Sequence, residues 1–96
     1  MSVDEIEWDA AKAENNLVKH GVSFEAAQYV FDDVFALERC DFDSDPSEIR
    51  YVITGIVREV VLTVVYTERG GRIRIISARK ATTHEQREYD HGQTAQ

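Results

Sequence analysis

The sequence predicts an α+β domain in which helices pack on a twisted antiparallel sheet. Three observations lead there: apolar residues at helical spacing near the N-terminus, four extended segments separated by turn residues, and a last segment that opens with a helix cap. The 96 residues suffice for one modest core, and the apolar (43%) and charged (30%) fractions are those of a folded globular chain. We therefore expect a single domain over residues 1–96.

The N-terminal third predicts one short strand and two helices. Residues 5–8 read as the strand, Asp9 stands where a first helix would be capped, and Gly21 supplies its stop. Ser23 can cap a second helix directly afterwards. Apolar residues fall on one face at Ala10, Ala13 and Leu17 in the first helix, and at Phe24, Ala27 and Phe31 in the second.

The middle of the chain predicts four strands. The first two cover about residues 35–42 and 48–56, with a turn around Pro46 between them. Residues 60–66 form a β-branched run that is apolar on both faces, which is typical of a central strand. Gly70-Gly71 reads as a hairpin turn into a last strand over about residues 72–78.

The C-terminal segment predicts one more helix. Thr82 and Glu85 have the spacing of a capping box, in which each residue hydrogen-bonds the backbone N–H of the other. We expect this helix to run to Tyr89 and residues 90–96 to form a polar tail.

The charge of the chain is distributed unevenly. The net charge is -7, yet residues 1–48 hold 13 acids and 3 bases, whereas residues 49–96 hold 5 acids and 8 bases. A basic second half on an acidic body favours binding of a polyanion at a local site. Cys40 stands alone, so no internal disulfide forms, and the acidic N-terminus lacks the features of a secretory signal. We expect a cytoplasmic protein that makes no contact with a membrane.

The glycine hairpin predicts a cationic surface. A two-residue turn sets Arg69 opposite Arg72 and Thr67 opposite Arg74, so that all four side chains share one face. Arginines directly opposite each other repel unless an anion or an acidic partner lies between them. Either an anion-binding surface or an ordinary solvated sheet face accounts for this pattern, and Arg79 and Lys80, which follow on the same segment, favour a ligand-binding role.

The residue types near the hairpin suit phosphodiester chemistry without a metal. Such cleavage needs a base, an acid, and cations for the charge that develops on phosphorus. Arginine and lysine meet the last need, and either Glu68 or His20 could transfer protons. The histidines are far apart in sequence, no Cys-x-x-Cys pair occurs, and no helix follows the two glycines, so we expect no metal and no cofactor.

Several longer motifs resemble one known family. Lys19-His20-Gly21-Val22-Ser23-Phe24-Glu25, Thr67-Glu68-Arg69 and the run from Arg72 through Arg79-Lys80 to Thr82 are similar to the BrnT toxins, and the likeness covers about residues 6–89. It implies a fold related to RelE-type ribonuclease toxins, cleavage of RNA that inhibits translation and arrests growth, and neutralisation by a BrnA-like antitoxin with a ribbon-helix-helix domain. Any contact with DNA would then be made through the toxin-antitoxin complex.

The resemblance also selects site residues. It points to catalytic roles for His20, Glu68, Arg74, Arg79 and Lys80, and to RNA binding by Lys19, Arg69 and Arg72. The alternative is a non-catalytic binding module, in which the same basic hairpin face engages an acidic protein partner. Residues 38–48 match the family weakly and are acidic, which sets this loop apart from the rest of the chain.

Overall fold

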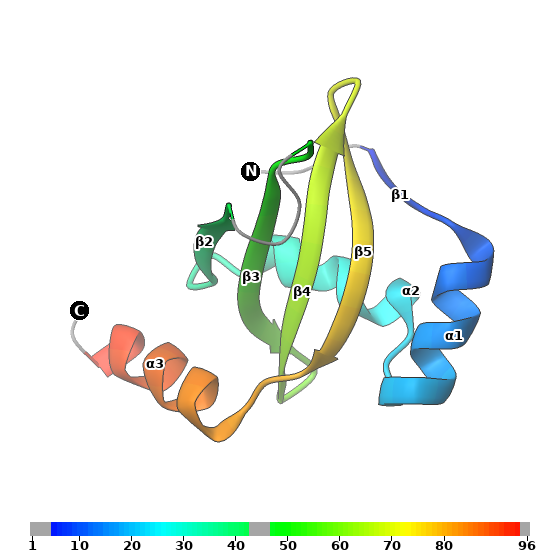
Figure 1. Cartoon of the computed structure of the whole chain (residues 1–96). Helices are drawn as coiled ribbons and strands as arrows, with labels where there is room; N and C mark the ends of the chain where they lie inside the picture. The colour runs from blue at the N-terminus through cyan, green and yellow to red at the C-terminus, as the bar shows by residue number, and fades with distance from the viewer. Residues whose placement is uncertain (1–4, 43–46, 95–96) are drawn as a thin grey trace.

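A computed structural model describes residues 5–42 and 47–94 of the chain. The described residues form one mixed sheet with the strand order β1-β5-β4-β3-β2, together with three α-helices and a short 3₁₀ helix (Figure 1). Along the chain the elements are β1 (Ile6–Trp8), α1 (Ala10–His20), α2 (Phe24–Ala27), η1 (Gln28–Asp32), β2 (Leu37–Asp41), β3 (Arg50–Val57), β4 (Val60–Arg69), β5 (Arg72–Lys80) and α3 (Thr83–Thr94).

The α+β architecture predicted from the sequence is confirmed, with one difference in the sheet. Strands β2 to β5 pair antiparallel as expected, but β1 adds a fifth strand parallel to β5, with Ile6 beside Ile73. The long connection between these strands permits the parallel pairing, which a short hairpin would not allow. A three-residue segment such as Ile6-Glu7-Trp8 predicts a strand but not its neighbour. The turn predicted at residues 43–46 lies outside the described residues.

Local signals in the sequence set the helix ends. The Asp9 side chain accepts a hydrogen bond from the Lys12 backbone N–H, and Gly21 ends α1 at a φ of 71°, a left-handed conformation that glycine adopts without strain. Ser23 caps α2 through the Ala26 N–H, and the expected second helix continues as the 3₁₀ turn η1. Helix α3 runs to Thr94, past the predicted end at Tyr89.

The core lies between one face of the sheet and the layer formed by α1, α2 and η1. Its fully buried side chains come from both layers: Phe24 and Val30 from the helical side, and Val64 and Ile75 from β4 and β5. Strand β4 occupies the middle of the sheet, as its β-branched run predicted. The buried Asn16 side chain joins the layers, since it donates to the Ala78 carbonyl and accepts from the Ala78 N–H.

The aromatic side chains belong mainly to this core. Trp8 meets Phe24 edge-on at a centroid distance of 6.1 Å, and Tyr66 stacks on Tyr51 at 5.2 Å. The Tyr66 hydroxyl donates to Glu38, and burial together with this carboxylate raises the pKa of Tyr66. Within the described part of the chain, no helix is long and apolar enough to cross a membrane.

Candidate active site

The sheet face opposite α1 and α2 carries a concentration of arginines, which we call the arginine face. The strand registers put six of them there, from four strands: Arg39, Arg50, Arg69, Arg72, Arg74 and Arg79. Helix α3 crosses one end of this face, where its Glu85 accepts a hydrogen bond from Thr63 (Figure 1). No other helix in the described part of the chain covers the rest of the arginine face.

The hairpin end of the arginine face has the predicted geometry. Arg69 pairs with Arg72, Thr67 with Arg74 and Glu68 with Ile73. Both turn glycines have positive φ values, 56° and 79°, as a two-residue hairpin turn requires. The prediction that Thr67, Arg69, Arg72 and Arg74 share one face is confirmed.

The chain itself supplies anions for these arginines. Glu7 from β1 lies 2.9 Å from Arg74 and 3.5 Å from Arg72, while Glu48 lies 3.1 Å from Arg69. Arg74 holds the pKa of Glu7 below its usual range, and Arg69 does the same for Glu48. The expected repulsion between opposite arginines is therefore relieved inside the molecule, without an external ligand.

Arg79 lies at the other end of the arginine face in a tighter arrangement. Its guanidinium makes two contacts with the Glu85 carboxylate, at 2.6 and 2.9 Å. Glu85 also accepts from the Thr63 hydroxyl and from the Thr82 backbone N–H, and the Thr82 hydroxyl accepts from the Glu85 N–H in return. The predicted capping box is thus confirmed. The same carboxylate fixes Arg79, and Arg79 is the main reason that the pKa of Glu85 falls to about 2.

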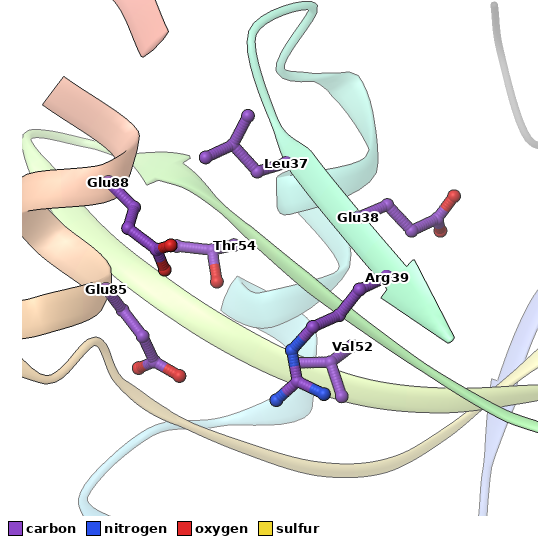
Figure 2. Close-up of a pocket in the computed structure, with 7 residues that line it drawn as sticks. All are labelled: Leu37, Glu38, Arg39, Val52, Thr54, Glu85 and Glu88. Carbon is purple, nitrogen blue, oxygen red and sulfur yellow. The ribbon is translucent and has the colours of Figure 1, made fainter. Parts of the chain in front are cut away.

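A cavity of about 210 Å³ opens beside this pair (Figure 2). Figure 2 shows Arg39 reaching from β2 over Val52, while Glu85 and Glu88 extend from α3 toward the sheet. Leu37, Glu38 and Thr54 complete the lining. Within the described residues Arg39 makes no ion pair, so the cavity combines an unpaired guanidinium, two carboxylates and the adjacent Arg79.

The remaining predicted residues lie elsewhere. His20 and Lys19 form the last turn of α1, on the helical side of the sheet. Lys80 faces the same side, since it pairs with Leu62 of the core. Glu68 also faces this side, since it pairs with Ile73 of the core, but it stands at the hairpin end, six residues from the Lys80 partner, or about 20 Å along β4.

The predicted site residues therefore form three groups and not one. Arg69, Arg72 and Arg74 lie together at the hairpin end of the arginine face. Arg79 pairs with Thr63, four residues from the Arg74 partner Thr67, or about 13 Å along β4. Lys19, His20, Glu68 and Lys80 occupy the opposite side of the sheet.

Sequence reasoning missed three cavity residues: Arg39, Glu85 and Glu88. The capping-box spacing predicts only a helix-capping role for Glu85. Arg39 lies in an acidic segment, which gives no indication of a cationic site. Successive side chains of a strand point to opposite faces of the sheet, so Arg39 shares a face with Leu37 and Asp41. This alternation is the sequence signal that assigns Arg39 to a face.

Comparisons with known proteins identify the family. The model of the BrnT ribonuclease toxins of type II toxin-antitoxin systems matches residues 8–85, which is 78 of the 96 residues. This range includes the last residue of β1, the strands β2 to β5 and the first turn of α3 with Glu85. A search among proteins of curated function gave no match. The chain belongs to the BrnT family of ribonuclease toxins, whose partners in type II systems are protein antitoxins.

Proposed function

We propose that this chain is a metal-independent endoribonuclease that cleaves RNA on the arginine face, at the cavity beside Arg79. The observation that carries the proposal is the Arg79–Glu85 pair, which orients a guanidinium by two short contacts at the edge of an open cavity. A planar guanidinium held in one orientation suits a phosphate, to which it can donate two parallel hydrogen bonds. Arg39 adds a second cation at the same cavity.

The reaction needs two proton transfers besides this cationic stabilisation. The ribose 2′-oxygen bonds to the adjacent phosphorus, the bond from phosphorus to the 5′-oxygen breaks, and a cyclic phosphate results. A base must take the 2′-hydroxyl proton, and an acid must protonate the leaving 5′-oxygen. We assign the first role to Glu88, which lines the cavity, and the second to His84, whose ring nitrogen lies 3.5 Å from the Glu88 carboxylate.

Several observations bear on the competing assignments. Glu85 is a poor base, because Arg79 lowers its pKa to about 2, so we assign it to holding Arg79. His20 and Lys80 face the other side of the sheet, and Glu68 stands at its far end. Arg69, Arg72 and Arg74 would then hold the RNA backbone away from the cleaved bond.

The family membership extends the proposal to the cell. We infer a cytoplasmic toxin that inhibits translation and growth by cutting RNA, and whose antitoxin is a BrnA-like ribbon-helix-helix protein. Contact with DNA then belongs to the toxin-antitoxin complex, through the antitoxin.

Cleavage of a labelled RNA by the purified chain in the presence of EDTA tests the proposal. Replacing Arg79 with alanine should slow cleavage by about 100-fold or more, the usual effect of removing a transition-state donor. Arg58→Ala, a matched change on the β3–β4 turn, should have no effect. Arg79→Lys keeps a positive charge beside Glu85 and controls for folding, which circular dichroism checks in every variant.

Further variants separate the proton-transfer assignments. Glu88→Gln and His84→Ala should each reduce cleavage, whereas Glu68→Gln and His20→Ala should leave it unchanged. The reverse pattern would move the reaction to the hairpin end or to the helical side. A chain that binds RNA but leaves it intact with and without metal would instead be the non-catalytic binding module.

A further inference from the structure

A groove runs over the side of the molecule opposite the arginine face. Its lining residues come from α1, the start of α2 and the turn between β3 and β4. Two hollows of about 260 and 290 Å³ compose it, and Leu17 and Ser23 line both. The hollows therefore adjoin each other at these two residues, and we call the two together the groove; it shares no lining residue with the cavity beside Arg79.

The middle of this groove is apolar and open to solvent. Leu17 of α1 is 50% exposed and Val60 of β4 is 42% exposed, although the core lies directly beneath them. Ala13, Ala26 and Leu62 continue the apolar strip. A concave strip of apolar side chains bordered by charges is typical of a surface that receives a partner. Val34 is still more exposed, at 84%, but lines neither hollow and so offers no groove.

The two ends of the groove carry opposite charges. Glu14 and Glu25 line the end near the start of α1, whereas Arg58 and Lys80 line the end at the β3–β4 turn. A complementary partner must therefore be basic at one end, apolar in the middle and acidic at the other end. Helix α1 has 11 residues, about 16 Å, so three turns of a partner helix would fill the groove.

We infer that this groove binds an amphipathic helix of the protein antitoxin, with its acidic N-terminal end at Arg58 and Lys80 and its basic C-terminal end at Glu14 and Glu25. The orientation follows from helix stability, because acidic side chains favour the N-terminus of a helix and basic ones the C-terminus. The partner helix then runs antiparallel to α1. The inference uses the family's protein partner and not the proposed catalytic residues.

The test is a calorimetric titration of the purified full chain with its cognate antitoxin. Leu17→Glu and Val60→Glu each put an unpaired carboxylate into the apolar strip and should weaken binding by about 30-fold or more, as expected at the centre of an interface. Val34→Glu is the matched control, since it makes the same change outside the groove and should alter affinity less than about threefold. Glu14→Lys together with Glu25→Lys should also weaken binding, because it reverses the charge that the basic end of the partner meets.

The outcomes separate this inference from the proposed function. Circular dichroism and RNA cleavage report folding of each groove variant, and both should match the wild-type chain. Wild-type affinity in Leu17→Glu and Val60→Glu would overturn the inference, as would a change confined to self-association of the chain. A chain without ribonuclease activity whose groove variants still lose the antitoxin would refute the proposed function and support the groove.

Discussion

The Glu85→Gln substitution tests the hydrogen-bonded group that Glu85 forms with Arg79, Thr63 and the N-terminus of α3. Glu85 holds Arg79 by two contacts, caps α3 and accepts from Thr63, with only 16% of its side chain exposed. These contacts lower its pKa from the ordinary 4.5 to about 2, and Arg79 contributes most. A difference of that size corresponds to about 3 kcal/mol of folding free energy at neutral pH. Because glutamine keeps the shape but not the charge, the variant should lose most of this amount.

The free energy of unfolding that Glu85→Gln loses should depend on pH between about 4.5 and 2. The pKa of Glu85 is lower in the folded than in the unfolded chain, so its stabilisation is complete above pH 4.5 and disappears as the pH falls toward 2. The difference between the wild-type chain and Glu85→Gln should therefore be about 3 kcal/mol at pH 7 and roughly 1.4 kcal/mol at pH 3. Urea denaturation at both pH values, followed by circular dichroism, measures it.

A matched control on the same helix makes this result specific. Glu88 has 60% of its side chain exposed and, among the residues that the structure describes, pairs only with the exposed His84, so Glu88→Gln should change stability by less than about 0.5 kcal/mol. If Glu85→Gln costs no more than this control at pH 7, or if its cost is the same at pH 3, then the carboxylate does not stabilise the fold through Arg79.

Three other substitutions test separate features. Asn16→Ala leaves the Val22 carbonyl and both Ala78 backbone groups without their buried partner and should cost about 2–4 kcal/mol in urea denaturation; a cost below about 1 kcal/mol would mean that water replaces the amide. Gly71→Ala forces a side chain into a φ of 79° and should cost about 1 kcal/mol, visible as a lower Tm, whereas an unchanged Tm would show that the turn rearranges. Glu7→Gln releases Arg74 and should tighten RNA binding roughly twofold to fivefold in fluorescence anisotropy at low salt. Unchanged affinity would argue against RNA contact by Arg74.

Most of the fold could be predicted because its signals are local. Asp9, Gly21 and Ser23 mark helix ends through hydrogen bonds that reach three or four residues, and Gly70-Gly71 fixes the hairpin register through its own backbone angles. The pairing of β1 with β5 could not be predicted in the same way. It joins residues 67 positions apart, and a three-residue strand carries too little pattern to specify a neighbour.

The site was less predictable for a related reason. The arginines of the hairpin could be assigned to one face from spacing alone, but their acid partners Glu7 and Glu48 come from distant segments. The capping box with Thr82 accounts for Glu85 by itself, so the sequence does not predict the contact of Glu85 with Arg79. His20 and Arg79 belong to equally convincing motifs, yet strand alternation and helix packing put them on opposite sides of the sheet. Motif membership does not determine which side chains meet.

The ion pairs of the arginine face differ in how easily a phosphate could replace the carboxylate. Arg69 and Arg72 are more than half exposed, at 58% and 55%, and exposed pairs of this kind contribute at most about 1 kcal/mol. A phosphate can therefore take the place of Glu48 at Arg69, or of Glu5, which lies 2.5 Å from Arg72, at little cost. Arg79 and Glu85 are more buried and share a network with Thr63 and the α3 cap, so this pair should persist when RNA binds. On the proposed function, the hairpin arginines exchange partners to bind the backbone, while Arg79 stays fixed and presents its remaining donors to the reacting phosphate.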